Sequence, residues 1–107
     1  MRQEYYITLH SQLGPRDGTL SIAANGSLLS GTLTLLGFEN PVTGRMEGDG
    51  TVILSHPLQT AIDSYPCRSV FSSWGATLQG IVYLGTCSMR WSGVRRGRAG
   101  TSEECRE

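Results

Sequence analysis

The chain has 107 residues, of which 38% are hydrophobic, and nine basic residues balance nine acidic ones. This length and composition fit one globular domain with a single core and exclude a disordered chain. The zero net charge argues against partners held by bulk electrostatics, so we expect neither nucleic acid nor an anionic membrane.

A turn-then-strand phrase recurs along the chain. The tripeptide Asp-Gly-Thr at 17–19 returns at 49–51, and a weaker Gly-Thr copy follows at 85–86. In each copy a glycine, expected at positive φ, precedes alternating apolar and polar residues, which is the pattern of a β-hairpin. Helices are not expected, because glycine interrupts every candidate window.

Four strands are predicted in the first half of the chain: residues 4–10, 19–24, 27–36 and 42–47. The segment 14–18 is predicted to be a turn, because it contains a proline and two glycines. Asn25-Gly26 predicts a tight hairpin. The third strand has the cleanest alternation of apolar and polar residues in the chain.

Four more strands are predicted in the second half. The fifth follows Gly50 and continues to residue 62 past Pro57, which requires an edge, a bulge or a corner. The last three are residues 67–73, 76–84 and 86–94. In the sixth strand we place Cys67, Ser69 and Phe71 inward, because the opposite choice would bury Arg68.

Eight strands joined by short turns predict an all-β antiparallel meander with one apolar face. Without a helix to cover that face, the sheet must fold onto itself, as an up-and-down β-barrel or, alternatively, a two-sheet sandwich. Mid-strand Gly31 and Gly80 favour the barrel, whose corners commonly contain glycine. Pairing of the first strand with the eighth would distinguish it from the sandwich. We assign residues 1–94 to the barrel and 95–107 to a mobile polar tail.

The tract 17–36, Asp-Gly-Thr-Leu-Ser-Ile-Ala-Ala-Asn-Gly-Ser-Leu-Leu-Ser-Gly-Thr-Leu-Thr-Leu-Leu, resembles small bacterial proteins built as β-meander barrels. These are similar in architecture to the calycins, the group that holds lipocalins and avidins. The resemblance spans about residues 4–94 and implies architecture alone. The Gly-x-Trp of lipocalins has no counterpart near the first strand, since both tryptophans come late.

The inward side chains predict a filled interior rather than a ligand cavity. A barrel of eight strands is just wide enough to be filled by side chains or to hold one small ligand. The inward set has almost no polar groups to orient a guest, so a small apolar ligand, with Tyr5 and Trp91 as its binding wall, is the alternative. We place inward Tyr5, Ile7, Leu9, Leu20, Ile22, Leu29, Leu33, Leu35, Met46, Val52, Leu54, Phe71, Leu78, Val82, Leu84, Cys87, Met89 and Trp91.

One residue is a candidate for catalysis. His56 could act as a general base, with Asp63 or Cys67 as its partner, but a strand-end histidine packed or solvated beside a bend is the favoured interpretation. Asp17 and Asp49 are expected to bond local backbone N–H groups in turns. No phosphate-binding, nucleophile-elbow or metalloprotease motif occurs. We therefore expect a non-enzymatic protein without cofactor.

The cysteines and arginines of the chain indicate a compartment but no site. The three cysteines, at 67, 87 and 105, have no metal-ligand spacing, and their odd number suggests reduced thiols in a cytoplasm. No apolar signal segment or membrane span is expected. A basic concentration, Arg90, Arg95, Arg96 and Arg98, lacks stacking aromatics and is interpreted as solvated.

Apolar residues on the outer face predict self-association. Ile81 and Tyr83 point outward on the seventh strand, Val70 on the sixth and Ile53 on the fifth. Adjacent strands would join them into one patch that a homodimer could cover with a two-fold contact. Scattered surface hydrophobes are the alternative.

Overall fold

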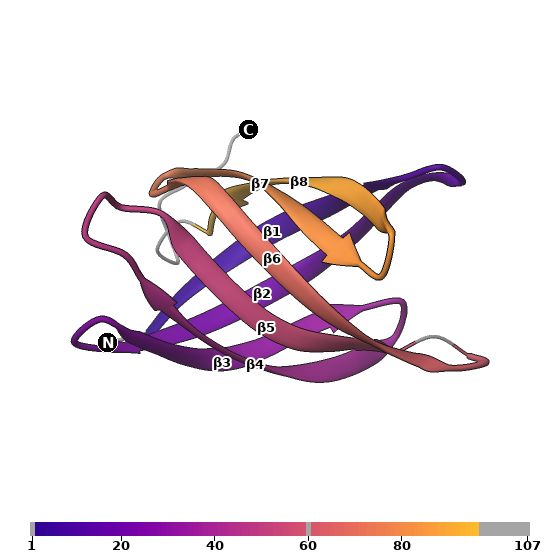
Figure 1. Ribbon diagram of the computed structural model, residues 1–107, viewed down its shortest axis with the longest axis horizontal. Helices are drawn as coiled ribbons and strands as arrows, with labels where there is room; N and C mark the ends of the chain where they lie inside the picture. The colour runs from indigo at the N-terminus through magenta and orange to yellow at the C-terminus, as the bar shows by residue number, and fades with distance from the viewer. Residues whose placement is uncertain (1, 60, 97–107) are drawn as a thin grey trace.

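The computed structural model describes residues 2–59 and 61–96, and this part of the chain forms a closed barrel of eight β-strands. The strands are β1 (Arg2–Ser11), β2 (Gly14–Asn25), β3 (Leu28–Leu35), β4 (Phe38–Met46), β5 (Val52–Gln59), β6 (Ser64–Trp74), β7 (Thr77–Leu84) and β8 (Cys87–Arg95). Each strand pairs antiparallel with the next, and β1 pairs with β8. The predicted meander barrel is confirmed, and the sandwich is excluded (Figure 1).

Mid-strand glycines allow neighbouring strands to approach closely. A Cβ atom on Gly31 would lie 1.7 Å from the Ser21 carbonyl oxygen of β2, and one on Gly80 would lie 2.5 Å from the Val70 carbonyl oxygen of β6. Real Cβ atoms do not approach backbone this closely, so both positions require glycine. In Figure 1 β5, β6 and β7 cross in front of β1 and β2.

Alternation along the strands predicted most of the core. In β6 the predicted inward residues Cys67, Ser69 and Phe71 are buried and Arg68 is exposed. The inward placements of Cys87 and Met46 are wrong: both residues are exposed. They occupy the first residue of β8 and the last of β4, where the barrel interior ends.

The predicted turn at 14–18 is wrong, because β2 already begins at Gly14 and the turn lies at residues 12–13. Gly18 is therefore not at positive φ, unlike Gly50 and Gly85 in the related phrases. A Cβ on Gly18 would lie 2.2 Å from the Thr34 carbonyl oxygen of β3. Close packing of strands, rather than a turn, requires this glycine.

The ladder between β4 and β5 is short. Its four residue pairs run from Thr43↔Ser55 to Met46↔Val52. Past this point β5 pairs with β6 alone, and Pro57, which has no N–H to donate, lies there. The fully buried Asn40 links the separated strands: its Nδ2 donates to the Leu33 carbonyl at 3.1 Å, and its Oδ1 accepts from the Gln59 N–H at 3.1 Å. Pro57 thus has the edge-like position predicted for it.

No helix suited to crossing a membrane occurs in residues 2–59 and 61–96.

Candidate functional site

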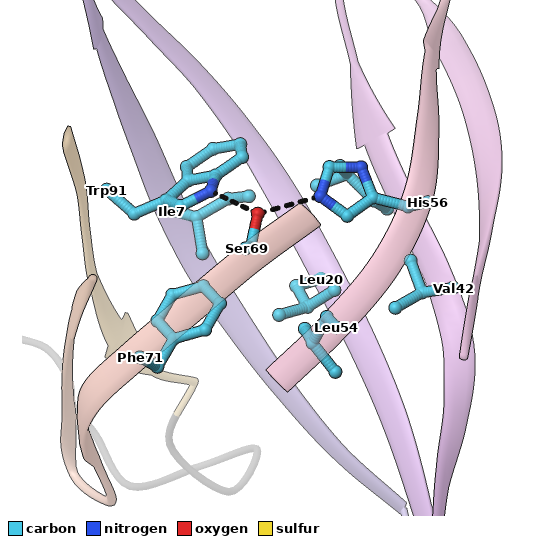
Figure 2. A pocket seen from close by; sticks show the side chains of 9 residues that line it. Ile7, Leu20, Val42, Leu54, His56, Ser69, Phe71 and Trp91 are labelled. Atoms are coloured by element: carbon cyan, nitrogen blue, oxygen red, sulfur yellow. Dashed lines mark hydrogen bonds between the residues drawn. The ribbon is translucent and has the colours of Figure 1, made fainter. Parts of the chain in front are cut away.

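Three polar side chains meet inside the barrel. His56 of β5, Ser69 of β6 and Trp91 of β8 point into the interior, with Ser69 between the two rings (Figure 2). The Ser69 Oγ lies 2.8 Å from His56 Nε2 and 2.9 Å from Trp91 Nε1. Only 6% of His56, 1% of Ser69 and 2% of Trp91 is exposed. We call this set the interior polar bridge.

Hydrogen-bond partners fix the proton positions in the interior polar bridge. His56 Nδ1 lies 3.0 Å from the Pro57 carbonyl oxygen, which can only accept, so Nδ1 carries the proton. The Ser69 hydroxyl then donates to the free Nε2 of His56, while Trp91 Nε1–H donates to the Ser69 oxygen. Burial lowers the pKa of His56, and its hydrogen bond to Pro57 offsets part of that effect. The ring is therefore neutral at neutral pH.

A serine whose hydroxyl donates to a neutral histidine has the geometry of a nucleophile and its base. The space beside it is small, however: the cavity has a volume of about 10 Å³. This is about the size of one water molecule by the same measure. It is lined by Ile7, Leu20, Leu33, Val42, Leu54, His56, Ser69, Phe71 and Trp91. In this conformation no substrate fits beside Ser69.

The structure separates the two residues predicted to share an apolar pocket. Trp91 lines the small cavity, but Tyr5 does not. The Tyr5 ring instead packs 5.2 Å from Trp74, which in turn packs edge-on to Phe71 at 5.1 Å between centroids. Desolvation raises the pKa of Tyr5, opposed by the charge of Arg95.

The proposed partners of His56 also differ from those in the structure. His56 Nδ1 bonds to the Pro57 carbonyl oxygen, and Nε2 bonds to the Ser69 hydroxyl. Neither nitrogen is bonded to Asp63 or Cys67. Cys67 is the register partner of His56 on β6, but burial raises the pKa of its thiol, which makes it a poor nucleophile. Ser69 was expected to point inward but not to be the partner of His56.

Other residues singled out in the sequence lie at the surface. Cys87 is an exposed free thiol, whereas Cys105 and Arg98 lie outside the described residues. Arg95 belongs to β8, and Arg96 donates its backbone N–H to the Glu4 carbonyl. The Asp49 carboxylate accepts from the Thr51 N–H as expected of a turn, but Asp17 accepts from the Thr8 hydroxyl of β1.

On the outer wall, register aligns the predicted apolar residues. Ile53 pairs with Val70, and Val70 pairs with Ile81, so these three side chains form one row across β5, β6 and β7. Ile81 is 41% exposed, and Tyr83, two residues further along β7, is 46% exposed. We call these four residues the β5–β7 patch.

Comparison with protein-family models, with curated proteins and with solved structures found no match for this chain.

We expect acid to destabilise the protein through His56. Its folded-state pKa is lowered by burial from the ordinary value of 6.5, so below that pH the unfolded chain binds more protons. The stabilisation from neutral His56 is therefore full above about pH 6.5 and is lost as the pH falls through the folded-state pKa. Chemical denaturation at about pH 7.5 and about pH 5.5 measures the loss.

The His56→Gln variant should lose less free energy of unfolding between the two pH values than the wild type does. The same measurement on His10→Gln shows how much of the acid-induced loss of stability comes from the other histidine. An equal acid-induced loss in His56→Gln and wild type would contradict this role of His56.

Proposed function

We propose that this protein is a non-enzymatic barrel that acts through protein–protein association, as a homodimer joined at the β5–β7 patch. The observation that carries the proposal is the unbroken apolar row Ile53–Val70–Ile81 on the outer wall. Solvated outer faces of antiparallel sheets are normally polar, and exposed apolar patches commonly mark interaction sites.

The charges beside the row support a second copy as the partner. Register places Arg45 beside Ile53 at one end of the row and Arg90 beside Ile81 at the other. Arg45 forms an ion pair with Glu47 at 2.5 Å, whereas within the described residues no carboxylate pairs with Arg90. A two-fold axis through the centre of the row exchanges its ends. It would bring the Arg45–Glu47 ion pair of one copy toward Arg90 of the other.

A stable dimer needs more surface than the apolar row alone. Standard interfaces bury roughly 800 Å² on each partner, so the contact would extend over Tyr83 and the flanking arginines. An apolar centre with a rim of arginine and tyrosine is the usual composition of such interfaces.

The cavity argues against the two competing functions. A carrier of small apolar ligands needs a pocket of several hundred Å³, whereas the interior cavity measures about 10 Å³. An enzyme that uses Ser69 would need the same space for its substrate. His56 also lines a hollow of about 520 Å³ with Pro57 and Cys67, but Ser69 does not line it. The free thiols of Cys67 and Cys87 favour a reducing compartment, and we propose a bacterial cytoplasmic protein of calycin-like architecture.

We expect Tyr83→Lys to dissociate the dimer, because two-fold symmetry places two added charges in one apolar contact. Light scattering over a concentration series should show a dimer for the wild type and a shift of at least about tenfold in the dissociation constant for the variant, about 1.4 kcal/mol. Leu13→Lys is the matched control, since Leu13 is 85% exposed in the β1–β2 turn. A dimer that persists unchanged in Tyr83→Lys would contradict the proposed interface.

A further inference from the structure

A second surface feature lies on a different part of the wall. A hollow of about 480 Å³ crosses β2, β1, β8 and β7, and this volume is within the range of small-molecule sites. We call it the outer trough. Its side chains include Tyr6, Thr8, Asp17, Gln79, Ser92 and Val94.

Two glycines form part of the floor of the outer trough. Gly18 of β2 and Gly93 of β8 both pair with Ile7 of β1, one from each side. Their Cβ atoms would lie 2.2 Å from the Thr34 carbonyl oxygen and 2.8 Å from the Tyr6 carbonyl oxygen. Close backbone approach therefore explains the glycines themselves, while the polar side chains along the trough need a separate explanation.

Register places four polar side chains in one line. Asp17 pairs with Thr8, Thr8 with Ser92, and Ser92 with Gln79, so the line crosses four adjacent strands. At about 4.8 Å between strands, it is roughly 14 Å long. This length corresponds to a ligand of two or three linked rings.

Neighbouring groups hold these side chains in place before any ligand arrives. The Thr8 hydroxyl donates to Asp17 Oδ1 at 2.9 Å, and Ser92 Oγ lies 2.7 Å from His10 Nε2. Fixed side chains lose less entropy on binding. Asp17 is unfavourable within a strand, and in the described part of the chain no arginine forms an ion pair with it. Its second carboxylate oxygen, Oδ2, accepts no hydrogen bond within residues 2–59 and 61–96 and is available as an acceptor there.

An apolar wall borders the same trough. Tyr6 is 51% and Val94 50% exposed, and the two residues pair across β1 and β8. The Arg96 guanidinium lies over the Tyr6 ring at 5.9 Å and forms an ion pair with Glu4 at 2.8 Å, which holds the guanidinium in this position. The Arg96 guanidinium covers one face of the Tyr6 ring, and Tyr6 still lines the outer trough.

We propose that the outer trough binds a neutral oligosaccharide of two or three rings. Sugar hydroxyls donate and accept at once, which suits a line of carboxylate, hydroxyl and amide groups. The C–H faces of sugar rings are apolar and suit Tyr6 and Val94. Asp17 disfavours anionic ligands, and no cluster of three potential metal ligands occurs in the described residues. This site is independent of the β5–β7 patch.

Nuclear magnetic resonance titration of isotope-labelled protein with three neutral sugars, cellotriose, maltotriose and triacetylchitotriose, tests the proposal. At least one trisaccharide should shift the backbone amide signals of Thr8, Gly18 and Gly93 in a saturable way. Asp17→Asn keeps an acceptor for Thr8 but removes the charge, and it should weaken binding at least about tenfold, or 1.4 kcal/mol. Tyr6→Ala should weaken binding similarly.

Thr32→Ala is the matched control, because Thr32 is on β3, away from the trough-lining residues, and binding should be unchanged. The proposal is overturned if none of the three trisaccharides shifts these signals. It is also overturned if Asp17→Asn and Tyr6→Ala bind as the wild type does.

Discussion

Replacement of Gly31 by alanine should lower the free energy of unfolding by at least about 3 kcal/mol, which is the upper end of the usual cost of overpacking. The added Cβ would lie 1.7 Å from the Ser21 carbonyl oxygen, 2.8 Å from the Ser21 carbonyl carbon and 3.0 Å from the Ile22 Cα. All three atoms are backbone of β2, so no side chain can rotate to make room. The β2–β3 ladder would have to separate at this point.

Chemical denaturation measures this effect, and Gly48→Ala is its control. A Cβ on Gly48 would have no heavy atom within 4 Å, and Gly48 has no positive φ, so its substitution should change the stability little. Such domains are commonly stable by only about 5–15 kcal/mol, on the order of a few times the predicted loss. If Gly31→Ala were as stable as Gly48→Ala, strands β2 and β3 could not pack as described.

Ser69→Ala should also be strongly destabilising, with an expected loss of about 2–6 kcal/mol, because removal of the hydroxyl affects two buried groups. Both Trp91 Nε1–H and His56 Nε2 would be left without a partner in the interior. Each unsatisfied buried group costs about 1–3 kcal/mol. Ser55→Ala is the control, because Ser55 is exposed on β5.

A double-mutant cycle separates this effect from simple loss of volume. In a Trp91→Phe background, the indole N–H is already absent, so Ser69→Ala should cost less than it does in the wild type. Equal costs in the two backgrounds would show that the Ser69–Trp91 hydrogen bond does not stabilise the barrel.

The architecture was predictable because it depends on period-two alternation and on hairpin glycines. Alternation placed Ser69 and Trp91 inward correctly, and the phrase at Gly50 marked a true turn. The same phrase failed at Gly18, where glycine serves close strand packing within β2. A local motif does not distinguish these two uses of glycine, since both exploit the missing side chain.

The interior polar bridge was only partly predictable. The parity that buries Val52 and Leu54 also places His56 inward, so its burial could have been inferred from the sequence. Its pairing with Ser69 could not, because that contact depends on the register between β5 and β6. The predicted strands 27–36 and 42–47 leave Asn40 between them, yet it lies within β4 and is fully buried. Its role depends on the separation of β4 from β5, which local sequence does not encode.

Native mass spectrometry of the protein purified from its own host tests the central claim most directly, because it reports association and bound ligand together. A filled barrel that associates through its outer wall should appear as a dimer with twice the mass of the chain and no additional mass from an interior ligand. A monomer that retains a small apolar molecule of fixed mass would contradict the account and identify the barrel as a carrier.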